Sequence, residues 1–191
     1  DTKEIEVAEK WILASLDKID HFKVGLEFYL RHGAAGIDRL RQVGKFDLFL
    51  DLKLYDIPNT VKGAVESVAR LEPKFLTVHA AGGVKMISEA AKALPNGSIT
   101  AVTVLTSFSE RDFHAMGQAQ SIEETTKSWA NIALASGATS LVCSPFEVGS
   151  LRKLSESAVL ITPGVRLEGD DMADQVRVMS PKDALSAGAN F

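Results

Sequence analysis

The chain has 191 residues, of which 46% are hydrophobic and 24% are charged, proportions ordinary for a globular domain with a sizeable core. Its formal net charge of −4 excludes a basic surface for nucleic acid or anionic membranes, and no apolar run is long enough to span a membrane. The single cysteine, Cys143, cannot form an intramolecular disulfide, so we expect a reducing, cytoplasmic compartment.

Short apolar or β-branched runs alternate along the chain with longer segments of helical period. The first half predicts helices over 3–16, 27–43 (bent near Gly33 and Gly36), 60–71 and 84–94. Strands over 21–24, 46–53 and 75–79 separate them. The second half predicts, in order, a strand over 99–105, a polar loop over 107–120, a helix over 121–136 and a strand over 140–143. A helix over 145–154 that begins at Pro145, a strand over 159–162 and a short helix over 181–187 follow.

Six strands that alternate strictly with helices indicate one domain over residues 1–191 with a parallel α/β architecture. A doubly wound open sheet fits the same order, although the run 80–83 lacks the spacing of a dinucleotide-binding fingerprint. The polar residues favour a (β/α)8 TIM barrel, whose active site lies at the carboxyl ends of its strands. Each predicted strand ends at or is followed by such residues, namely Lys23, Asp51 with Lys53, His79, Thr106, Ser144 and Thr162.

Asp51 and Lys53 end an apolar strand, and Asp56 follows in a turn stiffened by Pro58. Side chains two residues apart on a strand share a face, so Asp51 and Lys53 should lie side by side and buried. Such a pair is costly to bury and is usually retained for function, although an ion pair with only a structural role is the alternative. Together with Lys23, a nearly neutral array could place a cation beside a developing carbanion and an anion beside a departing carboxylate.

Other polar residues carry weaker signals. His79 is interpreted as a histidine at the edge of the core, and the remaining histidines fall in no metal-ligand spacing, so no metal site is predicted. Ser144 has no histidine partner at a recognisable spacing, which argues against a serine nucleophile. Arg166 follows a loop with Gly164 and is either a surface arginine or a phosphate ligand at the mouth of the barrel.

The run Asp51-x-Lys53-x-x-Asp56-Ile57-Pro58-Asn59-Thr60 resembles the signature of the orotidine 5′-phosphate decarboxylase family. Further matching blocks occur in the family's order over essentially the whole chain, at 22–26, 77–80, 104–107, 162–166 and 174–179. The resemblance implies a homodimeric TIM barrel that converts orotidine 5′-monophosphate to uridine 5′-monophosphate and CO2 in pyrimidine biosynthesis. It also implies that the reaction needs no metal or organic cofactor.

The resemblance assigns roles by position. Lys23, Asp51 and Lys53 resemble the family's charged network, with Lys53 as the proton donor to C6 of the pyrimidine. Asp56 resembles the aspartate that completes this network across the dimer interface, and Thr60 resembles a ribose contact from the same partner subunit. The other substrate-binding residues that it implies are Ile57, Thr106, Pro163 and the phosphate ligands Arg166 and Gln175.

Two departures from the family pattern concern the ends of the chain. The family opens with a strand that carries Leu-Asp and ends with a strand and a Gly-Arg phosphate contact. This sequence begins after the first of these strands and stops at Phe191, before the second. Because the two strands are neighbours in a closed barrel, a molecule without both would have an open edge. We therefore expect the sequence to be part of a longer chain, incomplete at both ends.

Two other functions stay open. A Mg²⁺-dependent sugar-phosphate decarboxylase or aldolase of the same barrel suite shares the Asp-x-Lys-x-x-Asp pattern. Such relatives carry Glu at the position of Lys23, and a lysine there repels a divalent cation. A non-catalytic phosphate-binding barrel, in which the charged cluster is only structural, is the second alternative.

Overall fold

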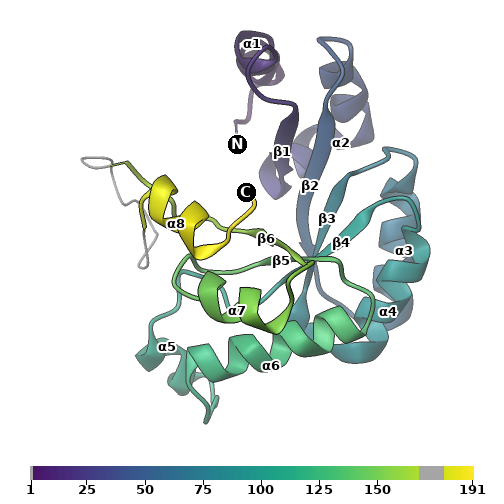
Figure 1. The fold of residues 1–191 in the computed structure, drawn as a ribbon. Helices are drawn as coiled ribbons and strands as arrows, with labels where there is room; N and C mark the ends of the chain where they lie inside the picture. Colours follow the sequence, from purple (N-terminus) through teal and green to yellow (C-terminus); the bar gives the residue numbers. More distant parts are fainter. Residues whose placement is uncertain (1, 168–178) are drawn as a thin grey trace.

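The computed structural model describes residues 2–167 and 179–191 as a curled parallel sheet with helices around it (Figure 1). The strands are β1 (His21–Gly25), β2 (Asp47–Leu54), β3 (Phe75–His79), β4 (Ser98–Val102), β5 (Ser140–Val142) and β6 (Val159–Ile161). The helices of the first half are α1 (Ile5–Ser15), α2 (Leu26–Arg41), α3 (Pro58–Ala69), the 3₁₀ turn η1 (Ala80–Gly82) and α4 (Gly83–Ala93). Those of the second half are α5 (Glu110–Ala115), α6 (Ile122–Ala135), α7 (Val148–Leu154) and α8 (Pro181–Ala187). Within these described residues, no helix is both long enough and apolar enough to cross a membrane.

The order of the strands decides between the two predicted architectures. Neighbouring strands pair in the order β1-β2-β3-β4-β5-β6, and every pair is parallel. A doubly wound sheet reverses its strand order at a switch point, whereas a barrel adds each new strand beside the previous one. The fold is therefore the (β/α)8 barrel type that the sequence predicted, with six of its strands in the described residues.

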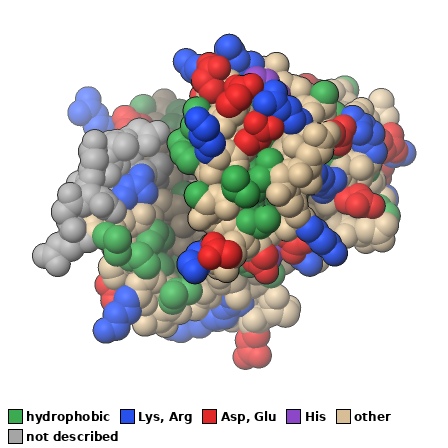
Figure 2. Space-filling model, turned by 90° about the horizontal axis from the view of Figure 1, so that it is seen from above, with side chains coloured by type: hydrophobic (Ala, Val, Ile, Leu, Met, Phe, Trp, Pro, Cys, Tyr) green, Lys and Arg blue, Asp and Glu red, His purple; other side chains and the backbone are tan. Residues whose placement is uncertain are grey.

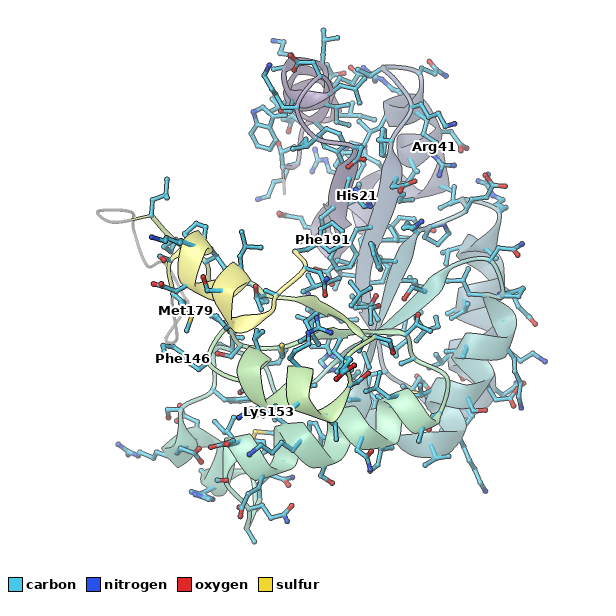
Figure 3. The ribbon with its side chains drawn as sticks, in the orientation of Figure 1. His21, Arg41, Phe146, Lys153, Met179 and Phe191 are labelled. Carbon is cyan, nitrogen blue, oxygen red and sulfur yellow. The ribbon has the colours of Figure 1, made fainter. Side chains whose placement is uncertain are left out.

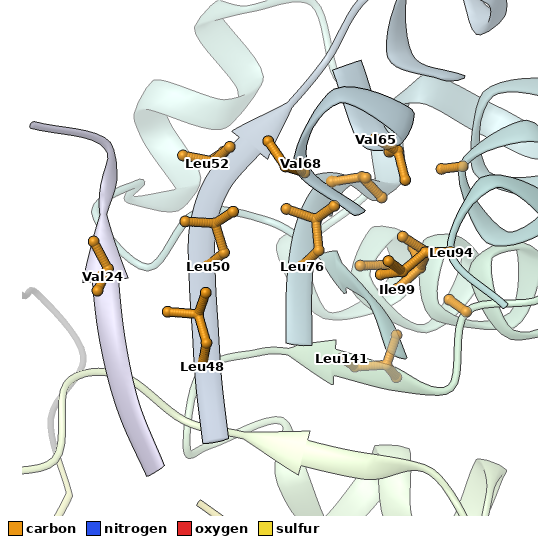
Figure 4. Close-up of a cluster of buried hydrophobic side chains, with 14 of the residues drawn as sticks. Val24, Leu48, Leu50, Leu52, Val65, Val68, Leu76, Leu94, Ile99 and Leu141 are labelled. Atoms are coloured by element: carbon orange, nitrogen blue, oxygen red, sulfur yellow. The ribbon is translucent and has the colours of Figure 1, made fainter. Parts of the chain in front are cut away.

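Apolar side chains on the outer face of the sheet form the core with the helices (Figure 4). Leu50, Leu76 and Ile99 are aligned across β2, β3 and β4, and none is more than 2% exposed. Helix α4 packs against both α3 and α6. Because side chains alternate along a strand, Thr77 and Thr100 point to the opposite face, the inside of the barrel. Packing of the outer layer thus determines which side chains face the interior.

The last residues of the chain lie beside β6 as a further parallel strand would. The Phe191 N–H donates to the Leu160 carbonyl at 3.2 Å, and the Thr162 N–H donates to the Phe191 carbonyl at 2.8 Å. The Phe191 ring lies beside the His21 ring of β1, with 5.0 Å between the two ring centroids (Figure 3). The sequence predicted that the chain stops just before the family's next strand, and these hydrogen bonds show that its last residue already pairs with the backbone of β6.

The predicted polar loop over 107–120 is wrong in one part, because it contains helix α5. Ser109 caps this helix by accepting a hydrogen bond from the Asp112 N–H. Phe113 anchors it in a small buried cluster with Val104 and Ile122. A helix this short shows no clear apolar period in the sequence, since its stability comes from the cap and from one buried ring.

The predicted start of the helix after β5 is also wrong. Helix α7 begins at Val148 and not at Pro145. The reason is a local turn, in which the Glu147 N–H donates to the Ser144 carbonyl and the Glu147 carboxylate accepts from the Ser144 N–H. This turn occupies the residues that would have formed the first helical turn.

Candidate active site

A cavity of about 540 Å³ opens at the carboxyl ends of the strands. Lys23 of β1 and Asp51 and Lys53 of β2 line one part of it, while Thr106 and Thr162 follow β4 and β6 at another. The rest of its lining is mostly apolar and consists of Phe49, Val102, Val104, Leu105, Ser107, Val142, Ile161 and Pro163. Polar groups from four strands therefore meet at one cavity, as the positions of these residues in the sequence predicted.

The polar residues that end β3 and follow β5 do not line this cavity. The His79 ring faces the Tyr55 ring at 5.7 Å between centroids, and burial together with the charge of Lys53 lowers the His79 pKa below 6.5. Ser144 is fully buried, and its N–H donates to the Glu147 carboxylate at 2.9 Å. The expectation that every strand contributes a polar group to the site is wrong for these two strands.

Asp51 is the centre of the charged cluster. The Lys53 Nζ donates to both of its carboxylate oxygens, at 2.8 and 2.9 Å, and the Lys23 Nζ donates to Oδ2 at 3.1 Å. The side chain of Asp51 is 10% exposed, but those of Lys23 and Lys53 are 45% and 39% exposed. The predicted burial is therefore correct for the aspartate and wrong for the lysines, whose ammonium groups face the open cavity.

Lys53 reaches Asp51 through an irregularity in β2. Pairing of β2 with β3 is regular up to Leu50 and resumes at Leu54, so three residues of β2 face the single residue Thr77 of β3. Lys53 has a φ of +49°, in the left-handed region that residues other than glycine rarely adopt. The predicted contact between Asp51 and Lys53 is confirmed, but the regular alternation of a strand is not what produces it.

Burial by itself raises the pKa of Asp51, but other interactions outweigh that effect. The hydrogen bond from Lys53 and the charges of Lys23 and Lys53 bring the pKa below 3.8, the ordinary value. The carboxylate is therefore ionised at neutral pH, between two ammonium groups and in hydrogen-bond contact with the Thr77 hydroxyl at 3.0 Å. A fixed array of charges of this kind can stabilise charge that develops in a bound molecule.

Asp56, Ile57 and Thr60 lie in and just after the turn between β2 and α3, outside the cavity. The Asp56 carboxylate accepts the Ile57 N–H at 2.6 Å. All three residues are exposed, and Ile57 is 67% exposed. The structure does not bring them together with Lys53 in the same chain, and their predicted contribution to the site of a partner subunit stays a prediction.

The remaining predicted site residues follow β4 and β6. Thr106 and Pro163 line the cavity, whereas Arg166 does not. The Arg166 guanidinium donates to the Val165 carbonyl at 2.9 Å, and its backbone N–H donates to the Met179 carbonyl at 3.0 Å. The prediction for Gln175 lies outside the described residues.

Sequence reasoning assigned no role to Thr77, which is fully buried in β3 between two apolar neighbours. Its hydroxyl contacts the backbone of Lys53 and the carboxylate of Asp51. A single hydroxyl residue within the otherwise apolar run 75–78 is a signal that could have marked it. Nothing in the sequence, however, states which residue of the neighbouring strand it meets.

The face of the molecule seen from above does not favour one sign of charge. Figure 2 shows acidic and basic side chains interspersed over this face. Among the residues that the structure describes, no group of three or more His, Cys, Asp or Glu side chains could hold a metal ion. Within residues 2–167 and 179–191, Lys23 and Lys53 are the cations that line the cavity and can attract an anionic ligand.

Comparison with known proteins gives consistent matches over the whole chain. A family model described as "Orotidine 5′-phosphate decarboxylase / HUMPS family" matches residues 1–191. The chain is 46% identical to the orotidine 5′-phosphate decarboxylase of Thermobifida fusca over 100% of its length and 82% of that protein. It is 38% identical to the orotidine 5′-phosphate decarboxylase of Frankia casuarinae, over 100% of the chain and 76% of that protein.

Two solved structures are similar to the fold. One is an uncharacterized conserved protein from Geobacillus kaustophilus, with a TM-score of 0.85 and 31% identity over 100% of this chain and 86% of that one. The other is the orotidine 5′-phosphate decarboxylase from Lactobacillus acidophilus, with a TM-score of 0.79 and 33% identity. That match covers 95% of this chain and 82% of the Lactobacillus chain.

Proposed function

The chain belongs to the orotidine 5′-phosphate decarboxylase / HUMPS family, and we propose that it converts orotidine 5′-monophosphate to uridine 5′-monophosphate and CO2 in pyrimidine biosynthesis. The observation that carries this proposal is the Lys23–Asp51–Lys53 array, which lines a cavity with an otherwise mostly apolar wall. The 46% identity to a decarboxylase of that name, over the full length of this chain, supports it.

The chemistry of this reaction calls for a fixed cation. Loss of CO2 from C6 of the pyrimidine leaves an electron pair in an orbital that the ring cannot delocalise. In the proposed mechanism the C6–carboxylate bond breaks, its electron pair stays on C6, and a proton moves from the Lys53 ammonium to C6. The Lys53 ammonium stabilises the developing carbanion and then donates its proton to C6, and solvent afterwards reprotonates the Lys53 amine.

Asp51 is proposed to destabilise the bound substrate. Its carboxylate is ionised and lines the same cavity, so it lies beside the carboxylate of the substrate and repels it until CO2 departs. The apolar wall, which includes Val102, Val142 and Ile161, lowers the local dielectric constant and strengthens both effects. Thr106 and Pro163, which also line the cavity, are proposed to contact the substrate.

The phosphate of the substrate is proposed to bind Arg166 and Gln175. Arg166 lies three residues beyond Pro163 of the cavity wall, and its planar guanidinium can donate two parallel hydrogen bonds to a phosphate. Phosphate binding far from C6 supplies binding energy that the enzyme can use to hold the pyrimidine in its reactive position.

We also propose that the protein, with residues 1–191 in a single barrel domain, acts as a homodimer. Asp56 and Thr60 then belong to the site of the partner subunit, together with the neighbouring Ile57. The exposure of Tyr55 (62%) and Ile57 (67%) on either side of Asp56 supports this, since both offer apolar surface for a partner to cover.

The first test is direct. The purified protein is mixed with orotidine 5′-monophosphate, and the fall in substrate absorbance is followed with and without EDTA, with uridine 5′-monophosphate quantified at the end. We expect turnover that EDTA leaves unchanged. No turnover of this substrate would contradict the proposal, and activity abolished by EDTA would favour the Mg²⁺-dependent alternative.

Lys53→Ala tests the role of the proton donor. Because Lys53 is proposed to supply both charge and proton, kcat should fall at least about 1,000-fold. Lys74→Ala is the matched control. The side chain of Lys74 is 55% exposed and faces Asp47 at the amino-terminal ends of β2 and β3, far from the cavity at their carboxyl ends. Near-wild-type turnover by Lys53→Ala in folded protein contradicts this role.

A further inference from the structure

A single hydroxyl group connects the two charged residues of β2. The Thr77 Oγ1 accepts a hydrogen bond from the Lys53 backbone N–H at 2.8 Å and donates one to the Asp51 Oδ1 at 3.0 Å. A hydroxyl has one proton to donate and lone pairs to accept with, so both bonds form at the same time. Thr77 is fully buried and does not line the cavity, so it touches the site only through these two residues.

The bond to Lys53 replaces a bond that a regular sheet would make between backbones. Three residues of β2 face Thr77 alone, so regular pairing with β3 is interrupted at Lys53. Lys53 also has a φ of +49°, which is unfavourable for a residue with a side chain. The Thr77 hydroxyl satisfies the Lys53 N–H in this conformation and thereby favours it.

The bond to Asp51 limits rotation of the carboxylate. Oδ1 receives the Thr77 hydroxyl and the Lys53 ammonium, while Oδ2 receives both ammonium groups. Without the hydroxyl, the carboxylate can turn and the lysine backbone can relax. Each change alters where the Lys53 ammonium lies. Moving a reacting group about 1 Å from its productive position can lower the rate of the chemical step about 100-fold.

We propose that Thr77 is a positioning residue, whose hydroxyl holds Lys53 in its left-handed conformation and Asp51 in its orientation before the substrate binds. This inference rests on the proposed function and extends it to a residue that touches no substrate. It implies that the hydroxyl, and not the volume of the side chain, is the property that the site requires.

The test compares three variants by kcat and KM for orotidine 5′-monophosphate. Thr77→Val keeps the volume and removes the hydroxyl, so kcat should fall about 100-fold while KM changes less than about threefold. Thr77→Ser restores the hydroxyl and should stay within about threefold of the wild type. Thr100→Val is the matched control, because Thr100 is also fully buried and faces the interior, but its hydroxyl pairs with Ser140. This control should stay within about threefold of the wild type.

Crystal structures of the wild type and of Thr77→Val separate this inference from the proposed function. We expect Lys53 to leave the positive-φ region or the Asp51 carboxylate to turn in the variant. Thr77→Ala replaces Thr77→Val in both measurements if the valine variant does not fold. Unchanged Lys53 and Asp51 geometry, or a kcat within threefold of the wild type, overturns the inference. A wild type that does not decarboxylate the substrate overturns the proposed function instead, and the two structures then still decide whether Thr77 positions these residues.

Discussion

Asp51 is the residue on which the charged cluster depends. Its carboxylate accepts hydrogen bonds from both Lys23 and Lys53, and its own side chain is 10% exposed. Two ammonium groups this close together would repel each other without a negative charge between them. Asp51 therefore keeps both cations at the cavity while its own charge remains available to act on a bound ligand.

The lowered pKa of Asp51 predicts a pH dependence of stability. The Asp51 carboxyl group loses its proton at a lower pH in the folded protein than in the unfolded chain. As the pH falls through about 4, the unfolded chain therefore binds more protons than the folded protein. The contribution of Asp51 is thus present above that pH and is lost below it. Urea unfolding between pH 7 and pH 3 should show a weaker loss of unfolding free energy in Asp51→Asn than in the wild type.

Asp38→Asn is the control for that measurement. Asp38 faces Arg70 at 3.4 Å on the surface, and its side chain is 51% exposed. This variant should follow the pH dependence of the wild type. If the unfolding free energy of Asp51→Asn falls with pH as steeply as that of the wild type, Asp51 is not the source of the pH dependence.

At the scale of elements, one arginine joins α7 to β6 and to the end of the chain. The Arg152 guanidinium donates to the carbonyls of Gly188, Glu156 and Ala158, each at 2.8 Å, and to the Asn190 side chain at 2.8 Å. These acceptors come from the turn before β6 and from the segment after α8. Arg152 therefore holds in place the residues that continue the sheet beyond β6.

Arg152→Ala should lower the free energy of unfolding by about 2–3 kcal/mol, because it leaves several partly buried carbonyls without their charged donor. Chemical unfolding measures the change. Lys153→Ala is the matched control at the next residue, which is exposed at the surface (Figure 3), and it should cost less than about 0.5 kcal/mol. Equal effects of the two substitutions would contradict the role assigned to Arg152.

At the scale of the whole molecule, the central question is which subunit completes each site. The Asp56 carboxylate is exposed and bonds to the Ile57 N–H of its own chain, outside the cavity that holds Lys53. The proposed homodimer makes the two groups parts of one site from two subunits. Such sharing can be tested by mixing subunits that carry different inactivating substitutions.

Mixed dimers of Lys53→Ala and Asp56→Ala should recover activity. If subunits exchange freely, half of the dimers are hybrids, and one of the two sites in each hybrid carries no substitution. The mixture should therefore reach about a quarter of wild-type activity per subunit. The control mixture, Lys53→Ala with Asp51→Ala, should show no recovery, because both residues come from the same chain of the same site. Activity no higher than that of the separate variants would place Asp56 in the site of its own subunit.

The match between prediction and structure depends on how local each signal is. The strand over 75–79 and the helix over 181–187 have the predicted bounds, since periodicity and capping residues lie within each segment. Helix α5 was missed because its one buried ring, Phe113, packs against Val104 and Ile122, which lie outside the segment. The contacts of Arg152 were also missed, since Gly188 and Asn190 lie more than 30 residues away in the sequence.

The sequence alone determined the alternation of strands and helices, the family resemblance and the grouping of Asp51, Lys53 and Asp56 in one short run. These depend on residue type and spacing along the chain. Only the tertiary structure decided that the strands follow one another in order, that Lys23 and Lys53 share a single carboxylate, and that Thr77 faces the irregular part of β2. The register between neighbouring strands sets these contacts, and register results from packing of the whole outer layer against the helices.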